Sequence, residues 1–160
     1  SFGQGMDLTM VQVAAGFSAM VNGGTYYSPT VIAGMMNDKN DFVKAKAKQS
    51  YANIIKQSTS AQMRDMIVKA RAAFYSTKDR PGYIVGGKTG TSQTIVNGSY
   101  ENGQTVATYL GFGGDTAPKY VIMVQVSGKN KNLAGNYDAM PIFTDISNWM
   151  IDYLTLQPKA

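Results

Sequence analysis

The chain has 160 residues, of which 44% are hydrophobic and 16% charged, and its formal net charge at pH 7 is +5. This length and composition indicate one globular core and leave too little chain for a second full domain. Cysteine and histidine are both absent, which excludes thiol catalysis, a Cys/His zinc site and a Ser/His/Asp triad. We expect neither a metal nor a cofactor.

The positive charge is spread along the chain. Its densest run is Lys44, Lys46 and Lys48, which alternate with alanine in a polar segment. This pattern favours a solvated face over a nucleic-acid patch, so we expect no nucleic-acid partner. The sequence has no apolar run long enough to span a membrane, and it starts at Ser1 rather than at a methionine. We interpret it as part of a longer protein whose targeting segment lies upstream.

The first predicted element is a helix. Thr9 and Gln12 form a Thr-x-x-Gln capping box ahead of apolar residues at helical spacing, and the Asn-Gly-Gly sequence at 22–24 ends the helix. Residues 25–36 are rich in β-branched and aromatic side chains, which favours an extended segment or an edge strand. Residues 37–57 are polar and ambiguous.

A second helix is predicted to begin near Thr59, because a glutamine again follows three residues on. We expect its apolar stripe to fill the core rather than to form a binding surface. That stripe consists of Met63, Met66, Ile67, Ala70 and Phe74.

Three strands are predicted next, over residues 83–93, 105–113 and 120–127. The short polar segment GDTAPK joins the last two and suits an antiparallel hairpin. The third strand is apolar on both faces, so we expect it to be covered on both sides. The segment TIVNGSYENGQ between the first two strands is predicted to be a protruding loop.

A closing helix is predicted from Met140 to Leu154, with Pro141 in its first turn. Trp149, the only tryptophan, lies on the apolar stripe of this helix, so we expect it in the core rather than stacked on a ligand. The full stripe is Ile142, Phe143, Ile146, Trp149, Met150 and Tyr153.

The stretch GGKTGTSQ, residues 86–93, places glycines inside a predicted strand. Such glycines cost stability unless something approaches the backbone closely, and a ligand lying along the strand is the simplest candidate. Lys88 would add a positive field, threonine hydroxyls would bind a carboxylate, and an edge strand could pair with a peptide-like ligand. From spacing alone, a structural glycine bulge with an exposed lysine remains the alternative. A phosphate-binding loop fits less well, because no helix is predicted to follow.

Several segments, in the same order, resemble the C-terminal part of the transpeptidase domain of class B penicillin-binding proteins. Lys88, Thr89 and Gly90 match the Lys-Thr-Gly element of the serine penicillin-recognising enzymes. The flanking matches are SFGQGMDLTMVQVAAGFSAMVNGGTYYSPTVI, the hairpin ATYLGFGGDTAPKYVIMVQV and the terminal helix NYDAMPIFTDISNWMIDYL. No serine is followed by lysine three positions on or by asparagine two positions on. The family's Ser-x-x-Lys nucleophile and Ser-x-Asn element are therefore absent, as expected of a fragment that begins downstream of both.

The resemblance implies an α+β sandwich, in which helices cover an antiparallel sheet, as an incomplete half of a penicillin-binding transpeptidase or β-lactamase-like fold. Its parts would be a mainly helical region with an extended segment at 1–82, three strands at 83–128 and a closing helix at 139–156. The upstream half of the same domain is then a partner of this chain.

The resemblance also implies a serine D-Ala-D-Ala transpeptidase, located at the extracytoplasmic face of the bacterial cytoplasmic membrane. A serine outside this chain would form an acyl-enzyme with a peptidoglycan stem peptide ending in D-Ala-D-Ala, and β-lactams would stall that step. We therefore expect the chain alone to be inactive. The alternatives are a β-lactamase or β-lactam sensor of the same superfamily, and a noncatalytic peptide-binding module.

Residue roles carry over from the matched motif. Lys88 would supply positive potential and a hydrogen bond, Thr89 and Thr91 would bind the ligand's carboxylate, and Gly90 would permit its approach. The backbone N–H of Thr91 would complete the oxyanion hole. Strand alternation predicts that Lys88 points to the opposite face from Thr89.

Each of the flanking residues has two alternative roles. Gly86 and Gly87 would either contact substrate or relieve crowding against a helix. Gln4 and Gly5 would either shape a turn near the cleft or touch the ligand. Tyr100 and Glu101 would either line the mouth of the cleft or lie in an exposed loop.

Overall fold

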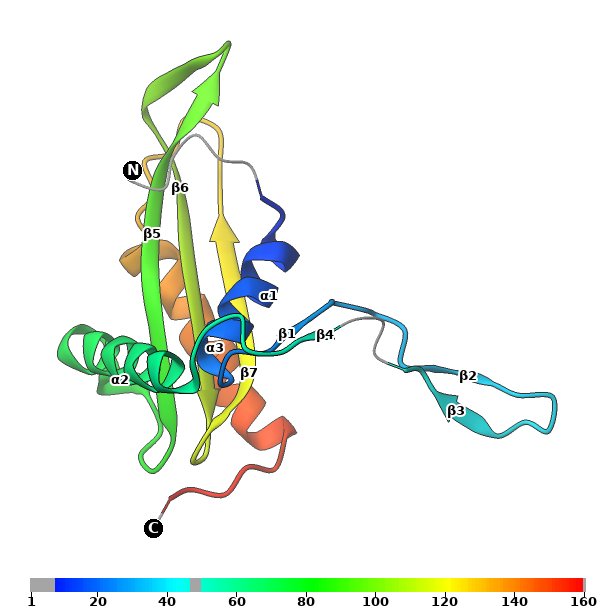
Figure 1. Ribbon diagram of the computed structural model, residues 1–160. Coiled ribbons are helices and arrows are strands. Elements are labelled where there is room, and N and C mark those ends of the chain that lie inside the picture. The colour runs from blue at the N-terminus through cyan, green and yellow to red at the C-terminus, as the bar shows by residue number, and fades with distance from the viewer. Residues whose placement is uncertain (1–7, 47–49, 160) are drawn as a thin grey trace.

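The computed structural model describes residues 8–46 and 50–159. Its main sheet has three antiparallel strands in the order β5-β6-β7, with bounds Ile84–Val96, Ser99–Gly114 and Pro118–Val126. The helices are α1 (Met10–Val21), α2 (Gln57–Phe74) and α3 (Met140–Tyr153). Figure 1 shows α3 running along one face of the sheet. The predicted antiparallel sheet with packed helices is thereby confirmed.

Two apolar clusters hold the layers together, one on each face of the sheet. Phe143 of α3 packs with Tyr109 and Val124 on the first face. Phe17 of α1 packs with Phe112 on the second face, where Ile67 of α2 joins them. Both α1 and α3 contact β7, so the prediction that this strand is covered on both sides is confirmed.

Helix α1 follows its local signals. The Thr9 hydroxyl accepts a hydrogen bond from the Gln12 N–H at 3.2 Å, and the Gln12 side chain accepts one from the Thr9 N–H at 3.0 Å. Gly23 and Gly24 follow the helix with φ of 101° and 98°, in the left-handed region that glycine tolerates. The predicted capping box and glycine stop are both confirmed.

Helix α2 differs from its prediction at the start and on its buried face. It begins two residues before Thr59, and its N-cap is Lys56, which makes no side-chain capping bond. Its buried residues are Ser60 and Arg71, whereas Met66 of the predicted stripe is 63% exposed and Phe74 is 77% exposed. The expectation that this stripe fills the core is therefore wrong for Met66 and Phe74, although Ile67 packs against the apolar cluster around Phe17. The fully buried positions of the helix are polar, because Ser60 and Arg71 hydrogen-bond to distant parts of the chain.

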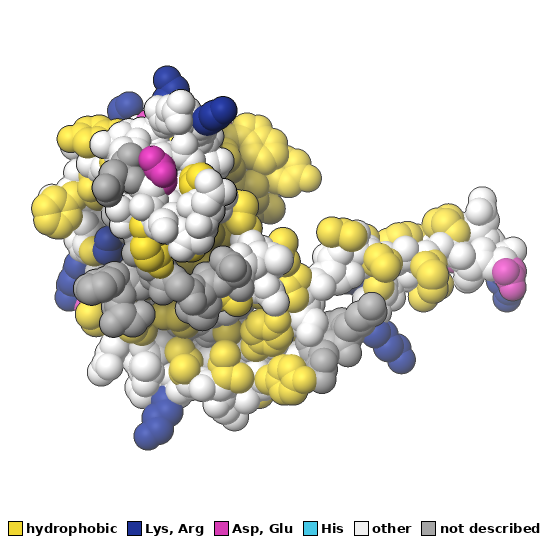
Figure 2. Space-filling view, turned by 90° about the horizontal axis from the view of Figure 1, so that it is seen from above, with side chains coloured by type: hydrophobic (Ala, Val, Ile, Leu, Met, Phe, Trp, Pro, Cys, Tyr) yellow, Lys and Arg dark blue, Asp and Glu magenta, His cyan; other side chains and the backbone are white. Residues whose placement is uncertain are grey.

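The segment between α1 and α2 forms two small antiparallel sheets. Strand β1 (Tyr26–Tyr27) pairs with β4 (Ser50–Tyr51), and β2 (Gly34–Met36) pairs with β3 (Phe42–Lys44). The predicted extended character of 25–36 is confirmed, and the ambiguous region supplies β3 and β4. The β2–β3 hairpin, here called the arm, projects from the body in Figure 1, and Figure 2 shows apolar side chains along it.

The segment predicted to be a loop after the first strand is instead the end of a long hairpin. Strands β5 and β6 continue to Val96 and from Ser99, joined by Asn97 and Gly98. These two residues have φ of 52° and 80°, as the two-residue turn of such a hairpin requires. This segment therefore lengthens strands β5 and β6, and their hairpin protrudes beyond the end of β7 (Figure 1).

Helix α3 has the predicted extent and carries its proline in the first turn. A π-helical turn, Gly135–Ala139, precedes it. Its buried face consists of Phe143, Thr144, Ser147 and Ile151. Trp149 is 56% exposed and stacks on Tyr153 at 4.7 Å between ring centroids. The prediction of a core tryptophan is wrong, because the buried face of the helix carries Thr144 and Ser147 and leaves Trp149 on the other side.

Candidate active-site strand

The Lys-Thr-Gly element lies on β5, which pairs with β6 on one edge and with no strand of the described residues on the other. Lys88, Thr89 and Gly90 pair across the ladder with Leu110, Tyr109 and Thr108. Lys88 and Thr91 are exposed, and Thr89 and Gly90 are half-buried. The structure thus places the predicted ligand-binding residues together on an accessible edge strand.

Lys88 turns its ammonium back toward Thr89. Its Nζ donates to the Thr89 Oγ1 and to the Thr89 carbonyl oxygen, each at 3.1 Å. The expectation that the two side chains point apart is therefore wrong, because a long side chain on an edge strand can reach around the backbone. Within the described parts of the chain, Lys88 forms no ion pair.

The carbonyl of Thr89 lies on the open edge of β5, since the Lys88 ammonium can reach it. Backbone groups of an antiparallel strand alternate between its two edges, so the N–H of Thr91, two residues on, faces the same open edge. The Thr91 hydroxyl accepts a hydrogen bond from the Gly135 N–H at 3.2 Å. This contact ties the strand to the turn that precedes α3.

The two glycines before Lys88 have packing roles. A Cβ at Gly86 would lie 2.8 Å from the Phe112 ring and 3.1 Å from Ile67 of α2. A Cβ at Gly87 would lie 2.3 Å from Cε1 of Tyr109 and 2.6 Å from its hydroxyl. Relief of crowding, against a helix for Gly86 and against a strand residue for Gly87, thus accounts for both glycines.

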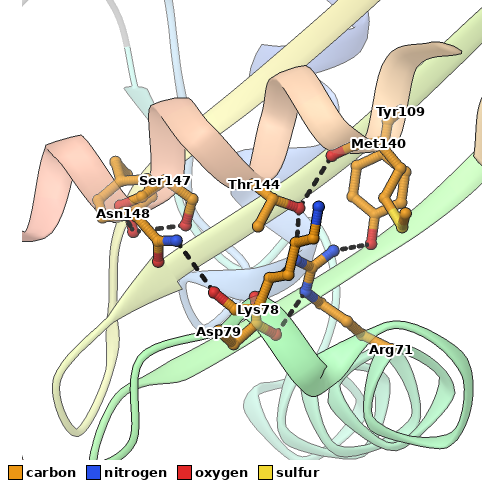
Figure 3. A network of polar contacts seen from close by, with 9 residues as sticks. Arg71, Lys78, Asp79, Tyr109, Met140, Thr144, Ser147 and Asn148 are labelled. Atoms are coloured by element: carbon orange, nitrogen blue, oxygen red, sulfur yellow. Dashed lines mark hydrogen bonds and ion pairs between the residues drawn. The ribbon is translucent and has the colours of Figure 1, made fainter.

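A buried arginine lies beneath this strand (Figure 3). The side chain of Arg71 on α2 is 0% exposed, and its Nη2 and Nε donate to Asp79 at 2.6 and 2.8 Å. Its Nη1 donates to the Tyr109 hydroxyl at 2.7 Å, and Nη2 also donates to the Thr144 hydroxyl at 2.9 Å. Arg71 therefore joins α2 to β6 and α3.

The electrostatics of this cluster keep the arginine charged and the tyrosine neutral. Burial works against the charge of Arg71, but the hydrogen bonds and charge interactions with Asp79 and Tyr109 together outweigh it, so the pKa of Arg71 lies above its ordinary value. Burial also raises the pKa of Tyr109, against the opposing effect of the Arg71 charge. A buried charge is tolerated when it is paired and hydrogen-bonded, as it is here.

Lys88 lines two hollows that open beside β5. One, of about 210 Å³, lies between Lys88 and Thr89 and the end of α2 at Ala70, Phe74 and Tyr75. The other, of about 360 Å³, is almost wholly apolar, and its lining includes Phe17, Met20, Met63, Met66 and Leu110. The predicted core stripe of α2 thus forms the wall of a surface groove next to Lys88.

The remaining predicted site residues are less central. Gln4 and Gly5 lie outside the described residues. Tyr100 and Glu101 are on β6, near the end of the long hairpin, where Tyr100 pairs with Ile95. Both are exposed, and they are strand residues rather than loop residues.

Sequence reasoning missed Arg71, Asp79 and Tyr109. A charged residue on an amphipathic helix is normally assigned to solvent, and Arg71 is 38 residues from Tyr109 in the sequence. The one local signal is the opposite charge of Asp79, which follows Arg71 across a turn.

Among the helices that the structure describes, none combines the length and hydropathy that crossing a bilayer requires.

Two curated proteins are similar to this chain over nearly its whole length. Stage V sporulation protein D of Bacillus subtilis is 30% identical over 167 residues, which cover 99% of this chain and 25% of that protein. A probable peptidoglycan D,D-transpeptidase PenA of Neisseria flavescens is 26% identical over 163 residues, covering 99% and 38%. The chain therefore spans well under half the length of these curated relatives.

Solved structures share the fold. Penicillin-binding protein 3 of Mycobacterium tuberculosis, complexed with ampicillin, has a TM-score of 0.81 at 22% identity, over 98% of this chain and 37% of that one. Its aztreonam complex has a TM-score of 0.80 at 25% identity, and the match covers 98% of this chain and 38% of that one. A peptidoglycan synthetase from Bifidobacterium adolescentis has a TM-score of 0.83 at 17% identity, over 99% and 29%.

The family model for the penicillin binding protein transpeptidase domain matches residues 1–148. Together with the relatives above, this match confirms the resemblance inferred from the Lys-Thr-Gly strand and its flanking segments. The chain belongs to the penicillin-binding protein transpeptidase domain family.

Proposed function

We propose that this chain is the C-terminal part of a D,D-transpeptidase domain that cross-links peptidoglycan stem peptides and is acylated by β-lactams. The observation that carries the proposal is the position of Lys88, Thr89 and Thr91 on the open edge of β5. Family membership supports it, as do the D,D-transpeptidase name of a relative and the β-lactam complexes of structural neighbours.

In this proposal the ligand lies along β5, and the charged and hydroxyl groups there bind its end. The terminal carboxylate of a stem peptide, or the carboxylate of a β-lactam, accepts a hydrogen bond from the Thr89 hydroxyl. The Lys88 ammonium, 3.1 Å from that hydroxyl, adds a fixed positive charge. The Thr91 hydroxyl is the second carboxylate-binding group that the family motif implies.

The reaction is acyl transfer to a serine that lies outside this chain. The serine oxygen bonds to the carbonyl carbon between the last two D-alanines, the C–N bond breaks, and the leaving amine takes up a proton. The Thr91 N–H, on the open edge of β5, stabilises the negative charge that develops on the carbonyl oxygen. An amine of a neighbouring stem peptide then takes the acyl group and frees the serine.

The upstream half of the domain completes the site. It supplies the nucleophile and covers the apolar groove between α1, α2 and β6 that the described chain leaves open. Because the substrate is peptidoglycan, the domain works at the extracytoplasmic face of the bacterial cytoplasmic membrane, and no nucleic acid or cofactor takes part.

The test is Lys88→Ala in the full-length protein that carries this chain. Loss of the charge should slow acylation by a fluorescent penicillin by about 100-fold or more. The fold should be retained, since an exposed lysine contributes little packing. The measurement is the second-order rate of covalent labelling, together with thermal unfolding.

Lys119→Ala is the matched control, because Lys119 is also an exposed lysine on a strand of the same sheet. It should label at the wild-type rate. Labelling of Lys88→Ala within threefold of wild type would refute the role of Lys88. Rapid turnover of β-lactam by the wild-type protein would favour a β-lactamase, and binding of a D-Ala-terminated peptide without any acyl-enzyme would favour a noncatalytic module.

A further inference from the structure

The cluster around Arg71 touches the Lys-Thr-Gly strand at one point, the ring of Tyr109. Tyr109 is fully buried, and it pairs with Thr89 across the ladder. Its ring occupies the space beside Gly87 where a side chain would otherwise stand, and Gly87 directly precedes Lys88. The backbone from Gly87 to Thr89 therefore rests on this ring.

The ring is itself held by Arg71 and by Phe143. Arg71 donates a hydrogen bond to its hydroxyl at 2.7 Å, and the guanidinium carbon lies 5.5 Å from the ring centroid. Phe143 of α3 packs against it, with 4.6 Å between ring centroids. In Figure 3 the Arg71 side chain extends from α2 beneath α3 and ends between Asp79 and Tyr109. Asp79 and Thr144 fix the guanidinium in turn.

The same arginine sets the position of α2. Ala70 and Phe74, on the adjacent turn of that helix, line the hollow in which Lys88 and Thr89 lie. A shift of Arg71 would therefore move both the ring under the strand and the helix beside it. Small displacements of a catalytic group have large kinetic effects, of about 100-fold for roughly 1 Å.

We infer that Arg71, acting through the hydroxyl of Tyr109, is a positioning residue that holds Lys88 and Thr89 in register for acylation. Neither Arg71 nor Tyr109 contacts the ligand. The inference rests on the proposed function, because it assigns a role within the same site.

A second buried tyrosine allows this role to be separated from a purely structural one. Tyr120 on β7 lies on the same face of the sheet, and its hydroxyl hydrogen-bonds to Ser147 of α3 at 2.8 Å. It also covers a glycine, since a Cβ at Gly113 would lie 2.2 Å from its hydroxyl. Tyr120 is thus also buried, hydrogen-bonded and packed over a glycine, but its hydroxyl bonds to neutral groups rather than to an arginine, and it lies on β7, two strands from Lys88.

The experiment compares Tyr109→Phe with Tyr120→Phe in the full-length protein. Each variant keeps the ring and removes one buried hydroxyl, so both should lower the unfolding temperature, and Tyr109→Phe should do so by more, because its hydroxyl bonds to a charged group. Tyr109→Phe should slow penicillin acylation by about tenfold, whereas Tyr120→Phe should stay within twofold of wild type. The loss should appear in the limiting acylation rate rather than in the initial binding of the drug.

A double variant tests whether the effect passes through Lys88. In a Lys88→Ala background, Tyr109→Phe should slow acylation by clearly less than tenfold, because one of the two groups that it positions is gone. Arg71→Lys is the second route to the same result, since it keeps the buried charge but loses the bidentate geometry with Asp79. It should slow acylation as Tyr109→Phe does.

Equal slowing of acylation by Tyr109→Phe and Tyr120→Phe would overturn the positioning role. Full additivity of the acylation losses of Tyr109→Phe and Lys88→Ala would overturn it too. Acylation of Tyr109→Phe and Arg71→Lys within twofold of wild type would overturn it as well. If Lys88→Ala itself were acylated normally, the proposed function would fail and this inference with it. An effect of Lys88→Ala without one of Tyr109→Phe would sink the inference alone.

Discussion

Gly90 is tightly packed: Thr108 occupies the space of a Cβ at this position, and Gly135 lies close to its backbone. A Cβ there would lie 2.3 Å from the Thr108 hydroxyl across the strand pair. On the other face, Gly135 approaches so closely that its own Cβ would lie 2.6 Å from the Gly90 carbonyl oxygen. The strand between Lys88 and Thr91 therefore has little room to shift. This packing role of Gly90 stands beside the role that the motif implies, which is to let the ligand approach the backbone.

Gly90→Ala should destabilise the full-length protein by about 1–3 kcal/mol, the usual cost of overpacking. Thr108→Ala removes the hydroxyl and leaves the Thr108 Cβ at an ordinary 3.7 Å, so the double variant should recover most of the stability. Thermal unfolding measures both. An equal loss of stability in the single and double variants would contradict this account. Any acylation defect that persists after stability returns would reflect crowding of the ligand.

At the scale of elements, α2 begins without the signals that α1 has. Its N-cap, Lys56, is exposed and has φ −66° and ψ 143°, the extended geometry that a capping aspartate also adopts, and no acidic residue lies in the first turn. A lysine there offers no acceptor to the free N–H groups and repels the positive end of the helix dipole.

Lys56→Asp should therefore stabilise the protein by about 1 kcal/mol. The gain should shrink at high salt, since part of it is electrostatic. Lys44→Asp on the arm makes the same change of charge away from any helix, and it should leave the unfolding temperature nearly unchanged. An equal rise of the unfolding temperature in Lys56→Asp and Lys44→Asp would show that the change in net charge, not helix capping, stabilises the protein.

The elements that the sequence predicts correctly are those with local causes. Thr9 and Gln12 mark the start of α1 within one turn, and the short GDTAPK segment predicts the β6–β7 hairpin. The Asn-Gly pair at 97–98 was equally local, but its role as a hairpin turn was missed in favour of a loop.

The buried faces of α2 and α3 have distant causes and could not be read from periodicity. The Ser60 hydroxyl donates to the Met20 carbonyl and accepts from the Gly23 N–H, 37 residues away. Thr144 and Ser147 are buried for the same reason, as partners of Arg71 and Tyr120. Among the site residues, Lys88 to Thr91 were found through their glycine-rich spacing and the family motif, whereas the support beneath them was not.

The whole molecule exposes more surface than a compact protein of its mass. Its accessible area is 10875 Å², whereas a compact monomer of 17.2 kDa would expose roughly 7,800 Å². The arm accounts for part of the excess, and α2 adds strongly exposed apolar side chains at Met66 and Phe74. This surface next to Lys88 is where the proposal places the upstream half of the domain.

The chain by itself should not become covalently labelled by a fluorescent penicillin, although Thr89 and Lys88 form a hydroxyl and lysine pair at 3.1 Å. In that pair the ammonium donates to the hydroxyl oxygen, and an ammonium has no lone pair with which to take a proton. Acylation requires a nucleophile held beside both a base and oxyanion donors, and in the proposed function this chain supplies only one wall of that site. The purified chain is incubated with the drug, denatured and inspected for label at its mass, with the full-length protein as positive control. Stoichiometric label on the chain that disappears in Thr89→Ala would identify Thr89 as a nucleophile, and it would overturn both the fragment interpretation and the carboxylate-binding role assigned to this residue.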